Sequence, residues 1–231
     1  MKKLVLIGGG DTGRGNTEYT TKEIDEEIVK MSDKEKPNLL FIGLASSFSD
    51  SYYDYIKNIY KELGCNTVYL KKKNVINNPD IVKNKIKDAD IIYIGGGDTI
   101  KLYNTVKEYK IDELLKEAIE NNTVVAGISA GAILLSKEGF SDSLILRGES
   151  DKYTFIDGLG FYNISICPNY NDINKKKELT DTIKNTDKNV YGIENCSALK
   201  IIDDKIEVIK SNKDSNIYKC SYKNKLVEKV L

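Results

Sequence analysis

The alternation of short apolar segments with longer amphipathic ones constrains the fold of this chain more than any other feature of its sequence. The apolar segments expected to be strands in the first half are residues 3–8, 38–46, 65–70, 90–99 and 123–131. This order predicts a mostly parallel sheet with helices on both faces. Because right-handed crossovers place the carboxyl ends of such strands at one edge, we expect Gly8–Gly10, Gly95–Gly97 and Gly127–Gly131 to meet there.

The second half is richer in short strand-like segments, among them "SLILRG", "YTFIDG" and "YNISICP", and one helix is expected over residues 172–184. The segment "IIDDKIEVI" predicts a hairpin that turns at Asp203–Asp204. No repeat, linker or low-complexity segment divides the chain. We therefore expect a single domain over residues 1–231. It should be a three-layer α/β fold, a mostly parallel sheet flanked by helices, whose β-rich C-terminal part closes the sheet.

Charge and cysteine content narrow the classes of partner. Lys+Arg and Asp+Glu are both 35, so no electrostatic attraction to nucleic acid or to an anionic membrane is expected. No apolar run reaches the roughly 18 residues of a membrane-spanning helix, and the N-terminal apolar run ends at Ile7, too early for a signal peptide. The 4 cysteines are widely spaced and there is no histidine, which disfavours a zinc site. We expect reduced thiols, no metal or other cofactor, and a cytoplasmic location.

The segment "GISAG", residues 127–131, has the G-x-S-x-G pattern that presents a nucleophilic serine on a strand-to-helix turn. Apolar residues before and after it supply the strand and the helix that the pattern requires. In such a turn the backbone N–H after the serine, here that of Ala130, can bind an oxyanion, and the helix dipole adds positive charge. The alternative is a turn of small residues that serves packing alone.

A second glycine cluster, "IGGGDT", follows the fourth expected strand. Its backbone N–H groups can approach a ligand closely, although a plain tight turn is the alternative. Neither phosphate-binding pattern fits this loop. Gly8, Gly10 and Gly13 do match G-x-G-x-x-G, but the next strand ends in Gly43, where a dinucleotide site needs an acidic residue.

The motifs "LIGGG", "IGGGDT", "GISAGA", "ICPNYND" and "YGIENCSAL" occur in an order and spacing that resemble the dipeptidase E and cyanophycinase family of serine peptidases. The resemblance covers nearly the whole chain. It implies a fold like that of class I glutamine amidotransferase domains and an exopeptidase or dipeptidase activity, which several members direct to aspartyl bonds. It also implies a small peptide as partner and no metal or organic cofactor. The oligomeric state, monomer or homodimer, stays open.

The resemblance implies that Ser129 is the nucleophile and that the N–H groups of Ala130 and Gly97 form the oxyanion hole. Further residues of the glycine loop and of "GLASS", after the second strand, are expected to line the substrate cleft, together with Tyr170 beside Asn169: Gly96, Asp98, Thr99, Ser46 and Ser47. Arg147 is a candidate for binding a substrate carboxylate through two N–H groups. The alternative for Arg147 is an exposed charge at a strand end.

The general base of the family is a histidine after a proline, and Asn169 stands at that position. Asp142 and Glu194 match acidic residues of the family. An amide does not take a proton from a serine, and a serine without a base is a poor nucleophile. Three substitutes are open: a lysine, Glu194 or Asp142 acting directly if burial disfavours the charged form, and Tyr170 as a proton relay.

Two hypotheses from different classes follow. The chain is a serine peptidase that works through Ser129 with an altered base, or it is a catalytically impaired relative that binds small acidic peptides or metabolites in the same cleft.

Overall fold

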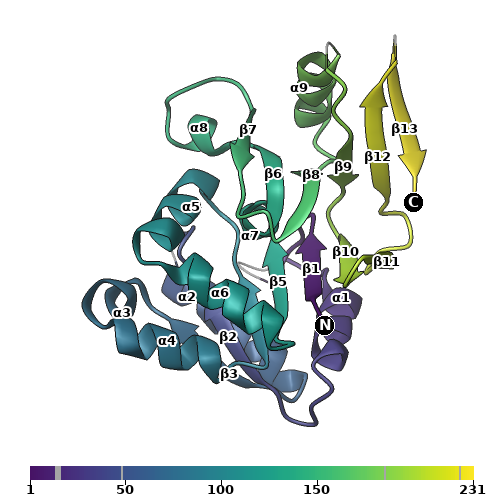
Figure 1. The fold of residues 1–231 in the computed structure, drawn as a ribbon. Helices are drawn as coiled ribbons and strands as arrows, with labels where there is room; N and C mark the ends of the chain where they lie inside the picture. The colour runs from purple at the N-terminus through teal and green to yellow at the C-terminus, as the bar shows by residue number, and fades with distance from the viewer. Residues whose placement is uncertain (14–16, 48, 185, 224) are drawn as a thin grey trace.

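The computed structural model describes residues 1–13, 17–47, 49–184, 186–223 and 225–231. One sheet of these residues contains β1 (Lys3–Ile7), β2 (Asn38–Ile42), β3 (Asn66–Leu70), β4 (Ile91–Ile94), β5 (Val124–Ile128), β10 (Ser197–Ile202) and β11 (Lys205–Lys210). A second sheet contains β6 (Ser136–Ser141), β7 (Thr154–Asp157), β8 (Tyr162–Pro168), β9 (Val190–Ile193), β12 (Ile217–Tyr222) and β13 (Leu226–Val230). The two sheets adjoin each other, and helices flank them (Figure 1).

The seven-stranded sheet has the order β11-β10-β1-β5-β4-β2-β3. Its strands β1 to β5 pair in parallel, as the sequence predicts. β10 and β11 extend it as an antiparallel hairpin in which Ile202 pairs with Lys205, so the turn at Asp203–Asp204 is confirmed. The α/β fold class is therefore confirmed, with strand carboxyl ends aligned along one edge.

The C-terminal part differs from the prediction in two respects. Only β10 and β11 join the parallel sheet, while the other strands build the six-stranded sheet β13-β12-β9-β8-β6-β7. The prediction of a short strand or turn at "SLILRG" is wrong, because this segment begins with helix α8 (Ser143–Leu146). Instead, Ser136–Ser141 forms strand β6, although "SKEGFS" has little intrinsic preference for strands. Pairing with β7 on one side and β8 on the other satisfies its backbone groups.

Helices cover both faces of the seven-stranded sheet, and their apolar sides fall into two separate cores. On one face lie α1 (Lys22–Met31) and α2 (Ser49–Glu62). On the other lie α3 (Lys72–Asn77), α4 (Pro79–Lys87), α5 (Thr99–Glu108), α6 (Ile111–Glu120) and α7 (Ala130–Leu135). Helix α9 (Ile173–Ile183) packs against the six-stranded sheet. The helix predicted over 172–184 is thus confirmed, with Asp172 as its N-cap.

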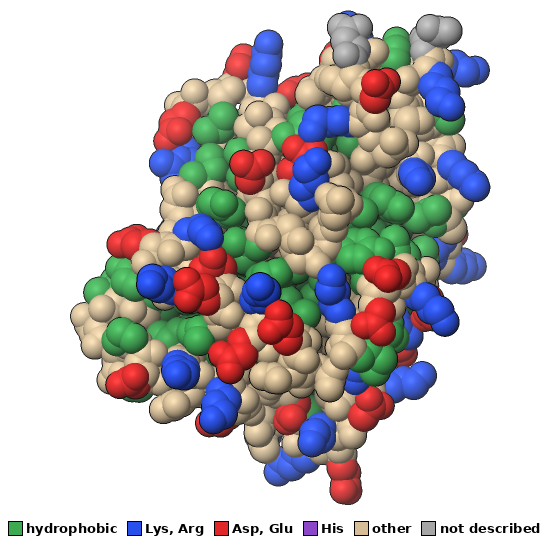
Figure 2. Space-filling model, viewed as in Figure 1, with side chains coloured by type: hydrophobic (Ala, Val, Ile, Leu, Met, Phe, Trp, Pro, Cys, Tyr) green, Lys and Arg blue, Asp and Glu red, His purple; other side chains and the backbone are tan. Residues whose placement is uncertain are grey.

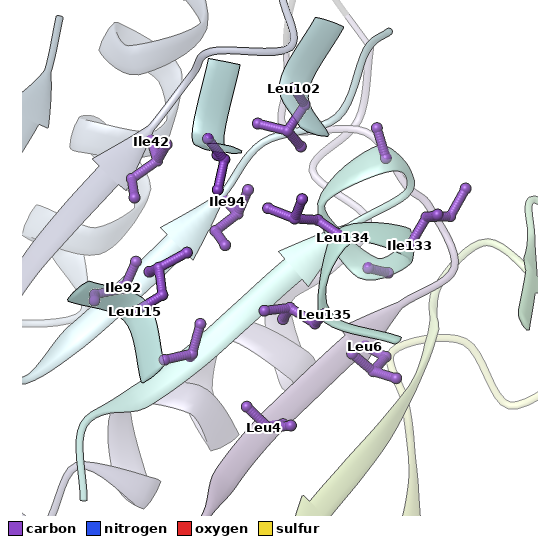
Figure 3. Close-up of a cluster of buried hydrophobic side chains, with 14 of the residues drawn as sticks. Leu4, Leu6, Ile42, Ile92, Ile94, Leu102, Leu115, Ile133, Leu134 and Leu135 are labelled. Carbon is purple, nitrogen blue, oxygen red and sulfur yellow. The ribbon is translucent and has the colours of Figure 1, made fainter. Parts of the chain in front are cut away.

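The helix α7 is buried along its whole length where the sheets meet. Figure 3 shows Leu134 and Leu135 of α7 directed toward the sheet, among Leu6 of β1 and Ile94 of β4. Each fully buried side chain of this kind stabilises the fold by roughly 1.5–3 kcal/mol. This packing fixes the start of α7, and therefore residue 129, relative to the neighbouring strand ends.

The surface mixes charges of both signs. Figure 2 shows Lys and Arg side chains interspersed with Asp and Glu over the face in view, which agrees with the balanced composition. Within the described residues, no helix combines the length and the apolar character needed to span a bilayer.

Candidate active site at Ser129

The turn between β5 and α7 holds Ser129 in a strained conformation. Its φ of 51° and ψ of −110° lie outside the regions that non-glycine residues normally occupy, which costs about 1–3 kcal/mol. The Ser129 N–H donates to Ile7 O at 3.0 Å, and Ser129 O accepts from Ile133 N at 3.0 Å. These bonds tie the turn to the end of β1 and to the first turn of α7, so the side chain projects at the carboxyl edge of the sheet.

The two glycines that flank the serine are required by close backbone approach. A Cβ at Gly127 would lie 2.3 Å from Gly131 O, and a Cβ at Gly131 would lie 2.2 Å from Ile94 O. The glycine clusters at the ends of β1, β4 and β5 therefore meet, as the sequence predicts. A Cβ at Gly96 would lie only 3.3 Å from Ser129 Cβ, so the glycine loop after β4 borders the serine directly.

The acceptor for the Ser129 hydroxyl is an amide. Ser129 Oγ donates to Asn169 Oδ1 at 3.1 Å, and Asn169 Nδ2 donates to Asn195 Oδ1 at 2.8 Å. Asn195 is held in turn, because its N–H donates to Asn171 Oδ1 at 3.1 Å. The line Ser129–Asn169–Asn195 has the geometry of a nucleophile, a base and an orienting group, but none of its three side chains titrates near neutral pH.

The backbone around Gly9 forms a cradle for this line. A Cβ at Gly9 would lie 2.2 Å from Asn195 Oδ1 and 2.3 Å from Asn169 Nδ2. Asn169 has a φ of 55°, a left-handed conformation that asparagine adopts more readily than most residues. Its N–H donates to Gly8 O at 3.0 Å. The glycines at the end of β1 thus position the amide pair and do not form a phosphate loop with it.

The loop after β4 carries backbone N–H groups that make no hydrogen bond among the described residues. Gly97 has a φ of 136°, and a Cβ there would lie 2.6 Å from Ala45 O, so only glycine fits. None of the hydrogen bonds among the described residues uses the N–H of Gly96, Gly97 or Ala130. Unpaired donors beside a serine that faces an open edge are the arrangement from which an oxyanion hole is built.

The predicted acids lie away from the amide pair. Glu194 Oε2 accepts from Asn216 N at 2.7 Å, and Asn195, the next residue, takes the place opposite Asn169. Asp142 stands at the N-terminus of α8, and none of the hydrogen bonds of the described residues joins its side chain to Ser129 or Asn169. The sequence resemblance matched Glu194 to the acidic residue of the family and did not identify Asn195, although both belong to the segment "GIEN".

Tyr170 points away from the serine. Its ring packs over Gly192, where a Cβ would lie 2.6 Å from the ring, and its hydroxyl donates to Glu228 Oε1 at 2.9 Å. Burial, followed by the nearby Cys220 and Glu228, raises the pKa of Tyr170 far above its usual value. The proton relay from Ser129 through Tyr170 does not fit this geometry, because Asn169 faces Ser129 while the next side chain, that of Tyr170, projects to the opposite side of the turn.

The remaining predicted residues form the rim and the support of the glycine loop. Arg147 Nη1 lies 3.4 Å from Asp98 Oδ2, and its Nε lies 2.7 Å from Glu149 Oε1. Asp98 also caps α5 by accepting from Lys101 N at 3.2 Å. Thr99 is buried behind the loop. The Ser46 carbonyl accepts from Lys101 Nζ at 3.5 Å, and Ser47 is exposed beside it.

The segment that carries Gly8–Gly10 continues to α1 and is anchored there by Asp25. Its carboxylate is fully buried and accepts from the hydroxyls of Tyr19, Thr21 and Tyr60 at 2.9, 2.8 and 2.6 Å. A Cβ at Gly10 would lie 2.4 Å from Thr21 Cγ2, so this network and the cradle are in contact. Burial raises the pKa of Asp25 to about 6, although the hydroxyl donors oppose the shift.

Other features of the described residues offer no competing centre. A cavity of about 640 Å³ beside α9 has Tyr153 and Glu178 in its lining, but Ser129, Asn169 and Gly97 are absent from it. No group of three or more Cys, Asp or Glu side chains within the described ranges is placed to hold a metal ion. The site that the residues build is therefore the one at Ser129.

Comparison of the sequence with known proteins finds similarity to one family of peptidases. The model of peptidase family S51 matches residues 4–209. A peptidase of Bacillus subtilis (strain 168), YgaJ, is 34% identical over 170 residues, which cover 74% of this chain and 69% of that protein. Peptidase E of Haemophilus influenzae (strain Rd) is 28% identical over 133 residues, covering 57% of this chain and 58% of that protein. This alignment therefore spans little more than half of the Haemophilus protein.

Comparison of structures agrees in the fold. The crystal structure of a peptidase from an acI-B1 Actinobacterium superposes with a TM-score of 0.71 at 23% identity, covering 100% of this chain and 94% of that one. At this level of identity the likeness concerns the arrangement of the elements.

Proposed function

Because the chain belongs to peptidase family S51, the dipeptidase E family, we propose that its Ser129 cleft binds small acidic peptides and hydrolyses them at most very slowly. The observation that carries this proposal is the hydrogen-bond line from Ser129 through Asn169 to Asn195, in which amides occupy both positions behind the nucleophile. Backbone N–H groups without an acceptor among the described residues would supply the oxyanion hole, while neither side chain behind the serine is basic.

The chemical reason lies in the fate of the serine proton. Attack on a peptide carbonyl by Ser129 Oγ requires that its proton move to a neighbour, and Asn169 Oδ1 accepts a hydrogen bond but does not take up the proton. In subtilisin, loss of the base lowers turnover about 10⁶-fold and leaves roughly 10³–10⁴ over water from binding and the oxyanion hole. We expect this chain to fall in the same residual range.

The ligand we propose is a short peptide that carries a carboxylate. The N–H groups of Gly97 and Ala130 would bind its carbonyl or terminal carboxylate oxygen. A ligand carboxylate could replace Glu149 as the partner of Arg147, since the Arg147–Glu149 pair is exposed. The four cysteines are unpaired, which supports a location in the reducing cytoplasm as part of this proposal. The proposed oligomeric state is a monomer or a homodimer. No role for nucleic acid or membrane is included.

Titration calorimetry with an α-aspartyl dipeptide tests the binding role. We expect Ser129→Ala to bind within a few fold of the native chain, because no covalent bond is needed. Gly97→Ala should lose binding, since its Cβ would meet Ala45 O at 2.6 Å. The matched control is Gly64→Ala, another glycine of positive φ (89°) whose Cβ would meet nothing within 4 Å. Absence of binding at millimolar peptide would overturn the proposal.

A second candidate is a working peptidase with an unrecognised base. The observation in its favour is the strained Ser129 at φ 51°, since strain of this kind is typical of functional sites. Binding alone does not need a strained serine. Turnover by the native chain that disappears in Ser129→Ala would favour this candidate over the first.

A further inference from the structure

Three buried hydroxyls join the glycine loop to the connection between β6 and α8. Thr99 Oγ1 lies 2.9 Å from Ser141 Oγ, and Ser141 Oγ lies 3.0 Å from Ser143 Oγ. The backbone takes part as well, because Thr99 N donates to Ser143 Oγ at 2.7 Å and Ser143 N donates to Ser141 Oγ at 3.2 Å. All three residues are at most 1% exposed, so water does not replace a lost partner.

Thr99 is the first residue of α5 and follows Gly97 by two positions. The first N–H groups of a helix have no acceptor within the helix itself. Here the Asp98 side chain accepts from Lys101 N, while the acceptor for Thr99 N is Ser143, a residue 44 positions further along the chain. The orientation of the loop therefore depends on a side chain from a different segment.

The loop is held from two sides. On the side of β2, Gly95 N donates to Ile42 O at 2.9 Å and Asp98 N donates to Ala45 O at 3.2 Å. On the side of β6, Ser143 holds Thr99, and Arg147 of the same segment lies 3.4 Å from Asp98 Oδ2. Between these points the Gly97 N–H has no acceptor among the described residues. The residue before it, Gly96, borders Ser129, since a Cβ there would lie 3.3 Å from Ser129 Cβ.

We propose that Ser143, supported by Ser141, is a positioning residue that sets the direction of the Gly97 N–H toward a ligand at Ser129. This inference rests on the proposed function, because it assigns the residues that keep the binding donor in place. Ser143 does not touch the ligand. Its hydroxyl fixes the start of α5, and the two peptide units before Thr99 transmit that position to Gly97.

The test compares Ser143→Ala with Ser136→Ala. Ser136 is the matched control, because it is also a fully buried serine, at the start of the preceding strand β6, and its hydroxyl donates to Ile133 O and Glu138 O and not to the loop. By amide hydrogen exchange we expect Thr99 to exchange at least tenfold faster in Ser143→Ala than in Ser136→Ala. The amide resonance of Gly97 should shift in the first variant only, and affinity for the α-aspartyl dipeptide should fall about tenfold.

Equal exchange at Thr99 and an unmoved Gly97 resonance in the two variants would overturn the inference, whether or not the peptide binds. If the native chain binds no peptide while Thr99 and Gly97 respond as expected, the proposed function fails but the positioning role of Ser143 stands. Ser143→Cys covers the case in which the alanine variant does not fold. It nearly keeps the size of the side chain and weakens the acceptor, so a smaller change in the same direction is expected.

Discussion

The two halves of the site are held in different ways. Ser129 is fixed by backbone bonds to Ile7 and Ile133 and by two glycines whose packing leaves no room for a side chain. Its counterpart, Asn169, is also bonded to the backbone, through its N–H to Gly8 O, but its amide group is oriented by a side-chain bond to Asn195 Oδ1. Backbone geometry therefore preserves the nucleophile, while the chemistry of the base depends on two side chains that a small number of substitutions can change. The difference suggests experiments that alter one half and leave the other intact.

The largest effect is expected from rebuilding the base side. In Asn169→His with Asn195→Asp, the imidazole stands beside Ser129 Oγ and the carboxylate accepts its other N–H. General-base catalysis contributes about 10²–10⁴-fold, so kcat/KM for an α-aspartyl dipeptide should rise at least about 100-fold. The rate should increase as pH rises through the range of a histidine pKa, about 6–7, because only neutral imidazole takes the proton.

Asn189→His, which places a histidine on an exposed segment, controls for the new residue itself, and Ser129→Ala in the rebuilt chain should abolish the gain. A rebuilt chain that is no faster than the native one would show that residue 169 is not placed to serve Ser129.

A second contrast is between the amide side chains of the site, which do not titrate, and the buried carboxyl group of Asp25, which does. The folded pKa of Asp25, about 6, lies above its ordinary 3.8, so the folded state binds the proton more tightly. The contribution of Asp25 to the free energy of unfolding is fully present below about pH 4 and is lost as pH rises through about 6. The loss amounts to up to about 3 kcal/mol, because the folded and unfolded pKa values differ by about two units.

Urea unfolding of the native chain and of Asp25→Asn between pH 4 and pH 7.5 checks this difference. The free energy of unfolding of the native chain should fall relative to the variant as pH rises. Peptide affinity should stay constant between about pH 5.5 and 7, because the side chains of Ser129, Asn169 and Asn195 do not titrate there and the carboxylates of the peptide, with pKa values near 4, are ionised. A constant difference between the two unfolding curves would contradict the assignment to Asp25.

Gly9→Ala should disturb the base side and spare the nucleophile. Its Cβ would lie within 2.3 Å of Asn169 Nδ2, and crowding of this kind typically destabilises by about 1–3 kcal/mol. Peptide binding should weaken with it. Gly13→Ala is the control for binding in the same segment, because the nearest atom to its Cβ would be 3.8 Å away, although its φ of 75° adds backbone strain to the alanine variant. Thermal unfolding and calorimetry report stability and binding, and equal peptide affinity of the two variants would remove Gly9 from the cradle.

The smallest effect is expected for Tyr170→Phe. It removes only the hydroxyl bond to Glu228, worth about 1 kcal/mol of stability. Peptide affinity and the activity of the rebuilt chain should not change, since this hydroxyl lies on the far side of the turn. A loss of activity with unchanged stability would instead restore Tyr170 as a proton relay.

The sequence predicts the nucleophile side almost completely, because its geometry follows from local pattern. Glycines at strand ends and the apolar runs around "GISAG" determine where Ser129 stands. The resemblance also brings Asn169 to the serine, and the observed distance is 3.1 Å. It does not determine the third position, because successive side chains at a strand end point in different directions. Glu194 therefore turns to Asn216, and its neighbour Asn195 faces the site.

The role of Ser143 could not be predicted from the sequence for a related reason. Strand β6 forms from a sequence with weak strand preference because two neighbours pair with it, and helix α8 occupies a segment whose apolar residues suggest a strand. The hydrogen bond from Thr99 joins residues 44 positions apart, and no local pattern marks either partner. Such contacts depend on the tertiary arrangement.

The most direct test of the central claim is the rate of hydrolysis of an α-aspartyl dipeptide by the native chain and by Ser129→Ala, measured side by side at neutral pH. If Asn169 and Asn195 leave the serine without a base, the two rates should be equal and close to the residual range, because Ser129 without a proton acceptor adds little. Ser129-dependent turnover of about 1–10³ s⁻¹, the usual range of enzymes, would contradict the account.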